Sequence, residues 1–355
     1  MTVEPQLLIT GDDRTGTLEI GGAVADLGFR VRLTEMPDEK DECVLVDIDS
    51  RHCAPHLARQ KIVDAHRAKA QHRCHKMDSG LRGNWAHEIC ALTDAGFKVG
   101  MLASFPDAGR TCVDGVVYIH GVKVEDSAFG IDPRNPLESS RPEEHLRAAG
   151  GGPALDDGNV VILNAAVNDQ LRAAADQCHA EARMLVGTTG GIGAYVASLR
   201  EAGRMPLPPL PRPALIVCGS LHPASRTQIA RLNLELNIDQ YAPNRAEDAA
   251  VAIEAGRDAV IISEEPGGPV SDSAAERMCA TLARLAWRTI EGSGVRTIVI
   301  LGGDTAAATL GDRPLRVIGS VDTAVALCRT EDQRLTVVTK GGGIGDDDML
   351  VRILT

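Results

Sequence analysis

The chain has few aromatic side chains, no excess of positive charge and no long apolar run. Phe, Trp and Tyr together make up 3% of its 355 residues. Its core is therefore expected to consist of Val, Ile, Leu and Ala, which suits buried parallel strands covered by helices. The formal net charge is −12 and no basic stripe occurs, so no nucleic-acid partner is expected. No apolar run approaches the roughly 20 residues that cross a bilayer, so no membrane partner is expected either.

Cysteine pairs of the metal-binding or redox type are also missing. The nine cysteines are scattered and form no Cys-x-x-Cys pair. The N-terminus lacks the basic segment of a secretory signal, so a reducing, cytoplasmic location is expected. Histidine and cysteine do cluster in two short segments, 52–56 and 72–75. Their spacing lacks paired zinc ligands, which favours surface histidines and buried thiols over a zinc site.

Short apolar runs alternate with helical patterns along the whole sequence. This alternation predicts an α/β fold class with two domains, each an open, mainly parallel sheet with helices on both faces. Residues 206–213 include five prolines, which neither a helix interior nor a sheet accommodates. This segment is expected to be a linker between a first domain, 1–205, and a second, 214–355. The polar, glycine-rich stretch 140–158 is expected to be a loop or a short irregular insert.

Charged side chains follow three predicted strands of the first domain. Asp12 and Asp13 stand between the first strand and a helix, where one carboxylate can cap the helix and the other can accept a hydrogen bond or a proton. The segments 76–84 and 105–111 add a lysine, two arginines and further polar groups. Ligands of such sheets bind beyond the carboxyl ends of the strands, and arginine grips carboxylates bidentately. These loops are expected to hold a polyhydroxy acid, with solvated loops as the alternative.

Glycine-rich turns follow three predicted strands of the second domain. They lie at 218–220, 301–306 and 340–346, and the second runs directly into a predicted helix. Glycine allows the backbone to approach a ligand closely, and amide groups at a helix start attract an anion. Neither a phosphate-loop motif of the G-x-x-x-x-G-K-[ST] type nor a convincing dinucleotide fingerprint is present. The three turns together predict a nucleotide site, and the missing fingerprint argues against a dehydrogenase.

The motifs in their order resemble those of the four-carbon acid sugar kinases. The family's D-D-x-T-G, K-x-D-S-x-L-R-G-N and F-P-x-x-G-R are matched at 12–16, 76–84 and 105–110. Its G-S with T/S-x-x-Q, its G-G-[DE]-T and its final K-S-G-N-F-G are similar to 219–228, 302–305 and 340–345. The resemblance implies a sugar-acid-binding first domain, a nucleotide-binding second domain, and phosphoryl transfer from ATP to a hydroxyl of a four-carbon acid such as a tetronate or an oxo-tetronate.

The resemblance also implies roles for individual residues. Asp13, as the base, and Asp78 would be catalytic, which leaves Asp12 as the expected cap of the helix. Substrate contacts would come from Asp12, Lys76, Arg82, Asn84 and Arg110. Nucleotide contacts would come from Ser220, Gly302, Gly303, Asp304, Thr305 and Gly342. The cofactors implied are ATP and Mg²⁺, with Asp304 a candidate metal ligand. The partners are a small sugar acid and ATP, and assembly as a homodimer is left open.

Several positions depart from the family pattern. Gly341 and Gly343 replace the usual Ser and Asn of the last motif, and Gly80 stands where Thr is common. These changes leave the choice among sugar acids open. They also motivate an alternative, a non-catalytic sensor of the same fold that binds a sugar acid and a nucleotide without turnover.

Overall fold

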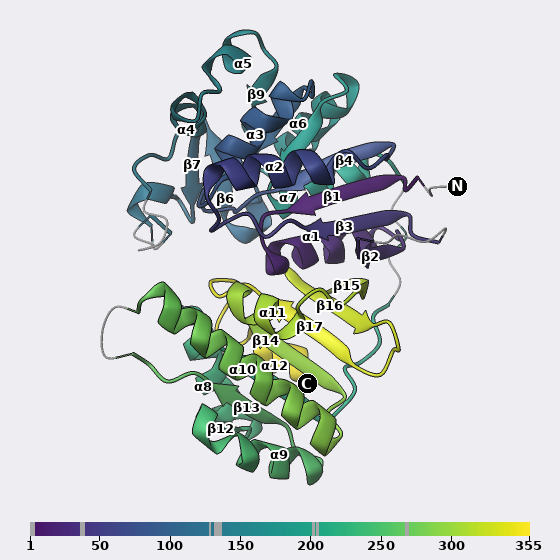
Figure 1. Cartoon of the computed structure of the whole chain (residues 1–355), viewed down its shortest axis with the longest axis vertical. Coiled ribbons are helices and arrows are strands. Elements are labelled where there is room, and N and C mark those ends of the chain that lie inside the picture. The colour runs from purple at the N-terminus through teal and green to yellow at the C-terminus, as the bar shows by residue number, and fades with distance from the viewer. Residues whose placement is uncertain are drawn as a thin grey trace. The chain divides into compact units, whose positions relative to one another are not determined.

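The computed structural model describes residues 4–35, 40–127, 129–130, 137–200, 203, 206–266 and 270–355. The chain folds into two compact units (Figure 1), unit 1 at Met1–Arg204 and unit 2 at Met205–Thr355. Each unit contains a sheet covered by helices. The α/β fold class predicted from the sequence is therefore confirmed.

The sheet of unit 1 has the order β2-β3-β1-β4-β10-β5-β9, and all of its pairings are parallel. Its strands are short and mostly buried, as expected for a sheet with two covered faces. Their bounds are β1 (Leu7–Gly11), β2 (Val31–Leu33), β3 (Cys43–Asp47), β4 (His72–Lys76), β5 (Val99–Leu102), β9 (Val160–Ile162) and β10 (Met184–Gly187).

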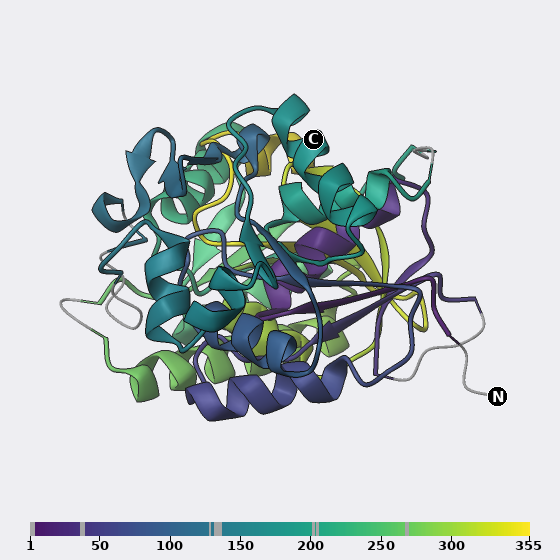
Figure 2. The same ribbon diagram turned by 90° about the horizontal axis from the view of Figure 1, so that it is seen from above.

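Helices cover both faces of this sheet. The helices that pack together on one face are α1 (Arg14–Asp26), α6 (Asn168–Ala180) and α7 (Thr189–Ala197). Those on the other are α2 (Pro55–Ala65), α3 (Trp85–Asp94), α4 (Pro142–Ala148) and α5 (Gly152–Asp156). Figures 1 and 2 show α2 along the outer side of the unit. The prediction of irregular structure at 140–158 is wrong, because α4 and α5 lie there, each with a proline in its first turn.

A small antiparallel sheet is inserted after β5. It consists of β6 (Arg110–Val113), β7 (Val116–Ile119) and β8 (Val122–Lys123). The turn between β7 and β8 consists of His120 and Gly121, and both residues have the positive φ that such a tight turn requires, 49° and 79°. The insertion places Arg110 at the start of β6.

The sheet of unit 2 has the order β12-β13-β11-β14-β17-β16-β15. Its first four pairings are parallel, and its last two are antiparallel. The strands are β11 (Ala214–Cys218), β12 (Asp239–Tyr241), β13 (Ala259–Ile262), β14 (Thr297–Leu301), β15 (Leu315–Asp322), β16 (Val325–Thr330) and β17 (Thr336–Lys340). The antiparallel pair β15–β16 was not predicted from the sequence.

The helices of unit 2 again lie on two faces. Helices α9 (Ala246–Glu254), α10 (Asp272–Ser293) and α11 (Gly303–Leu310) pack against one another, and α8 (Pro223–Leu236) packs against α12 (Met349–Leu354). No helix within the described ranges is both long and apolar enough to cross a membrane.

The proline-rich segment belongs structurally to unit 2. Leu207 and Leu210 pack against the core of this unit, and the Thr297 hydroxyl donates a hydrogen bond to Pro211 O at 2.6 Å. The segment therefore contributes to the packing of unit 2, and its role as a linker stays a prediction.

Candidate functional site

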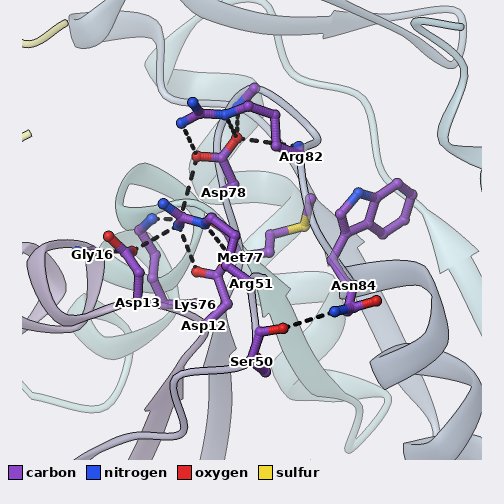
Figure 3. A network of polar contacts seen from close by, with 12 residues as sticks. Asp12, Asp13, Gly16, Ser50, Arg51, Lys76, Met77, Asp78, Arg82 and Asn84 are labelled. Atoms are coloured by element: carbon purple, nitrogen blue, oxygen red, sulfur yellow. Dashed lines mark hydrogen bonds and ion pairs between the residues drawn. The ribbon is translucent and has the colours of Figure 1, made fainter. Parts of the chain in front are cut away.

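Three loops of unit 1 meet at the carboxyl edge of its sheet (Figure 3). Strand β1 lies between β3 and β4, and their ends are level, since Gly11 pairs with Asp47 on one side and Lys76 on the other. The loops that follow therefore leave the sheet side by side. They carry the polar residues singled out in segments 12–16 and 76–84, together with residues 48–51.

Arg51 lies at the centre of these loops, and the sequence analysis missed it. Its guanidinium donates two hydrogen bonds of 2.8 Å to the Asp12 carboxylate and one of 2.7 Å to Asp13 Oδ1. Asp78 Oδ1 lies 3.6 Å from Arg51 Nη2. The Arg51 side chain is 12% exposed, so one largely buried cation serves three carboxylates. The sequence feature that could have indicated Arg51 is its position shortly after a predicted strand of the same sheet.

Asp13, and not Asp12, caps helix α1. Gly16 N donates to Asp13 Oδ1 at 3.1 Å and the Thr15 hydroxyl to Asp13 Oδ2 at 2.7 Å. The expectation that Asp12 is the cap is wrong, because the Asp12 carbonyl accepts from Ser50 N and Arg51 N and so fixes its residue to the neighbouring loop. The Asp12 side chain is fully buried against Arg51.

Burial and the neighbouring cations together shift the pKa values of Asp12 and Asp13 in opposite directions. Burial raises the pKa of Asp12, and Arg51 offsets this only in part. At Asp13, burial would also raise the pKa, but Arg51 and Lys76 outweigh it and lower the pKa below its usual value. Asp13 is therefore ionised at neutral pH, and its carboxylate is the more exposed of the two.

Asp78 and Arg82 form a bidentate ion pair within one loop. Arg82 Nε and Nη2 donate to the two Asp78 oxygens, each at 2.9 Å, and Gly80 N adds a third bond at 3.0 Å. Burial would raise the pKa of Asp78, but Arg82 and Arg51 hold it far below its usual range. The Arg82 guanidinium is therefore already bound to the Asp78 carboxylate. Its central carbon, Cζ, lies 5.0 Å from the centre of the Phe129 ring.

Lys76 and Asn84 are buried and bonded to the backbone. Lys76 is 3% exposed, and its Nζ donates to Met77 O at 2.9 Å. A Cβ atom at Gly16 would lie 3.2 Å from this Nζ, so the glycine allows the lysine to lie against α1. Asn84 Nδ2 donates to Ser50 O and Cys53 O at 2.7 and 2.8 Å, which ties the start of α3 to the loop after β3.

In unit 2, the three predicted glycine turns come together at one sheet edge, since β11, β14 and β17 are neighbours. A Cβ atom at Gly219 would lie 2.2 Å from Thr305 Oγ1, and one at Gly342 would lie 2.5 Å from Ser220 Oγ. Gly302, directly before α11, has φ 108° and ψ 136°, a conformation essentially confined to glycine. Gly303 begins the helix with ordinary helical geometry.

The Lys340 side chain is hydrogen-bonded to the backbone of the last of these turns. It is fully buried, and its Nζ donates to Gly341 O at 2.8 Å, Ile344 O at 2.9 Å and, at longer range, Gly342 O. Two residues of α8 hold the same turn, because Ser225 Oγ donates to Gly342 O at 2.7 Å and Gln228 Nε2 to Ile344 O at 3.0 Å. These two motif residues therefore shape the loop through its carbonyl groups.

A cavity of about 440 Å³ adjoins the first glycine turn. Its lining is Leu221, Pro223, Arg226, Thr227, Glu265 and Pro266. Asp304, in the first turn of α11, has an exposed side chain. No group of three or more His, Cys, Asp or Glu side chains among the described residues is placed to hold a metal ion.

Comparisons with known proteins assign a description to each half. Residues 7–155 match a family model described as a sugar-binding N-terminal domain, and residues 215–350 match one described as a nucleotide-binding C-terminal domain. The chain is similar to the D-threonate kinase of Cupriavidus necator, at 28% identity over 97% of this chain and 96% of the relative. It is also similar to the 3-oxo-tetronate kinase of Pectobacterium atrosepticum, at 21% identity over 98% of each chain.

A solved structure shares the fold. The crystal structure of a Haemophilus influenzae protein matches this chain with a TM-score of 0.70 and 16% sequence identity, over 98% of both chains. At this level of identity the likeness concerns the fold.

Proposed function

Because this chain belongs to the four-carbon acid sugar kinase family, we propose that it transfers a phosphoryl group from ATP to a hydroxyl of a four-carbon sugar acid. The observation that carries the proposal is the separation of two kinds of chemistry. Unit 1 gathers carboxylates and guanidinium groups at its sheet edge, and unit 2 gathers glycine turns at its own.

The unit 1 residues suit the binding of a polyhydroxy anion. Ionised carboxylates accept hydrogen bonds from hydroxyls, and buried cations balance the acid group. We assign the acceptance of the hydroxyl proton to Asp13 and the orientation of hydroxyls to Asp78. Lys76 and Arg110 contact the sugar acid directly. Asp12, Arg82 and Asn84 contribute to the same site, and their contacts with Arg51, Asp78 and the loop after β3 support a share in keeping its shape.

The unit 2 residues suit the binding of ATP. Backbone amides of Gly302, Gly303 and Gly342 would cradle the phosphates, as the open glycine geometry and the start of α11 favour an anion. Thr305 and Ser220 stand beside them. The cavity lined by Leu221 and Pro223 offers a volume suited to the base of the nucleotide.

Mg²⁺ fits this site as an ion shared with the nucleotide. In kinase sites it takes one or two carboxylates and completes its shell with phosphate oxygens and water. The exposed Asp304 carboxylate in the first turn of α11 supplies that kind of ligand. The ion, when bound, neutralises charge on the transferring phosphoryl group.

The test is a kinase assay on the whole chain with ATP, Mg²⁺ and a panel of four-carbon sugar acids, including D-threonate, D-erythronate and 3-oxo-tetronate. We expect ADP release with one or more of them. Binding of a sugar acid and of ATP without turnover would identify the sensor alternative. None of the nine cysteines, all of which lie in the described ranges, forms a disulfide, which supports a cytoplasmic location. Light scattering would test whether the chain assembles as a homodimer.

A further inference from the structure

A second group of polar side chains lies beside the three loops of the unit 1 site, at the start of α7. Strand β10 pairs with β4, so that Gly187 is level with Lys76. The residues after β10 therefore emerge at the same sheet edge as Lys76. Helix α7 packs against α1, which brings its first residue, Thr189, toward the α1 residue Glu19.

Thr189 carries a buried hydroxyl that no well-formed hydrogen bond of the described residues satisfies. Its side chain is 3% exposed, and within the described part of the chain its Oγ1 has no hydrogen-bond partner. The Glu19 carboxylate is its polar neighbour, and the hydroxyl acts to lower the pKa of that carboxyl. An unpaired buried hydroxyl costs free energy of folding, so its retention here needs a reason.

Glu19 differs from the three aspartates in its pairing. Asp12, Asp13 and Asp78 are each bonded to an arginine, whereas the Glu19 side chain forms no ion pair with a described residue and has the Thr189 hydroxyl as its polar neighbour. Burial raises its pKa, and Lys76 and Thr189 oppose this shift. Its side chain is partly exposed, so a ligand can reach it.

Arg110 completes this group with unused donors. It is 4% exposed, and its guanidinium donates one hydrogen bond to a described residue, to Ala108 O, while stacking 5.6 Å from the centre of the Phe129 ring. Burial lowers its pKa, and Glu19 and Asp78 act against that shift. The guanidinium of Arg82, in contrast, donates two of its hydrogen bonds to Asp78.

We propose that Glu19, Thr189 and Arg110 form the subsite that recognises the sugar acid. The substrate carboxylate binds the free donors of Arg110. One hydroxyl of the substrate donates to the Glu19 carboxylate and accepts from the Thr189 hydroxyl, which pairs both groups at once. This inference rests on the proposed kinase function and adds Glu19 and Thr189 to its substrate contacts.

The test uses initial-rate kinetics of the whole chain with ATP and D-threonate, and with two analogues that each lack one hydroxyl, 2,4-dihydroxybutyrate and 3,4-dihydroxybutyrate. Thr189→Val and Glu19→Gln should each raise KM for D-threonate about tenfold, the value of one or two hydrogen bonds. KM for ATP should stay unchanged. Thr189→Ser keeps the hydroxyl and should restore most of the affinity.

The analogues show whether these residues touch a hydroxyl. With the analogue that lacks the bound hydroxyl, the variants should lose no more than about twofold relative to the unaltered protein. Thr309→Val is the matched control, because Thr309 Oγ1 is also buried without a partner among the described residues but lies in α11 of unit 2. It should leave KM for D-threonate unchanged.

Two results would overturn the subsite. One is a KM for D-threonate within twofold of normal in both Thr189→Val and Glu19→Gln. The other is an equal loss with D-threonate and both analogues. If the unaltered chain turns over no tetronate, the kinase proposal fails separately, and calorimetry then decides the subsite. Weaker D-threonate binding by Thr189→Val supports it, and unchanged or undetectable binding contradicts it.

Discussion

Asp13 combines two properties that a single substitution can separate. It caps α1 through Gly16 N, and we propose it as the acceptor of the hydroxyl proton. Asparagine caps helices about as well as aspartate but cannot take a proton at neutral pH. The side chain at this one position therefore allows the structural and the chemical role to be measured apart.

We expect Asp13→Asn to lower kcat and, because it keeps the cap but loses the ion pair with Arg51, to lower the melting temperature by less than Asp13→Ala does. Loss of a general base costs roughly 10²–10⁴-fold in rate, and the lower end applies because the proton leaves late in a loose phosphoryl-transfer transition state. Asp13→Ala, the control, should lower the free energy of unfolding by about 1 kcal/mol through loss of the cap. Steady-state kinetics and thermal melts check both. Unchanged kcat in Asp13→Asn would move the base to another carboxylate, with Glu19 the first candidate.

The sequence placed most polar residues of the unit 1 site but not the contacts among them. Lys76 ends a strand and Asp12, Asp13 and Asp78 follow strands, and any parallel sheet would align these strand ends. Which of two adjacent aspartates caps the helix depends on backbone bonds to residues 50 and 51, and no local pattern contains that information. Arg51 was missed for the same reason, since its partners lie 39 and 38 positions away in sequence.

Among the elements, the turn before α11 depends on one glycine. Gly302 has φ 108°, whereas Gly303 is helical. We expect Gly302→Ala to lower the free energy of unfolding by about 1–3 kcal/mol and to weaken ATP binding. Gly303→Ala adds the same methyl group at a helical position that favours alanine, so it should not lower stability. Urea unfolding and calorimetric ATP titration of both variants test this, and equal destabilisation would show that the backbone conformation is not the cause.

The turn after β17 should give stability a dependence on pH. Burial lowers the pKa of Lys340 from 10.5 to about 8. Between these values the unfolded chain holds a proton that the folded chain has released, so the free energy of unfolding should rise with pH. The slope contributed is at most about 1.4 kcal/mol per pH unit.

Lys340→Met removes the titrating group from both states and should flatten this part of the profile. Urea unfolding of both proteins between pH 7.5 and 10 measures the difference in slope. Parallel profiles would mean that the four oxygen atoms around Nζ keep Lys340 charged over this range.

Elements with strong periodicity were predicted well, and short or mixed ones were not. The apolar runs of β1, β11 and β14 are fully buried, and burial on both faces is what makes such runs recognisable. Strands β15 and β16 include Arg316, Asp322 and Arg329 and have irregular register, so their alternation is weak. Helices α4 and α5 are seven and five residues long, too short to show a helical period.

For the molecule as a whole, the position of the proline-rich segment predicts where unit 2 can be cut. A fragment of residues 206–355 retains Leu207, Leu210 and the bond to Pro211 O, and we expect it to fold and bind ATP. A fragment of residues 214–355 loses these contacts. Because Leu207 and Leu210 are each only partly buried, the loss of stability should be about 1.5–3 kcal/mol, the value of fully burying one apolar side chain. Thermal melts of the two fragments compare them directly. Equal melting temperatures would show that the segment acts purely as a linker.

One guanidinium shared by three carboxylates also restricts the order in which this site can change over generations. If Arg51 is replaced while Asp12, Asp13 and Asp78 remain, three neighbouring anions lose a common counter-ion, and removing one partner of a buried ion pair typically costs about 3–5 kcal/mol. If an aspartate changes first, the arginine keeps two partners. A selection that varies all four positions should therefore recover lineages in which a carboxylate is lost before Arg51, and rarely the reverse.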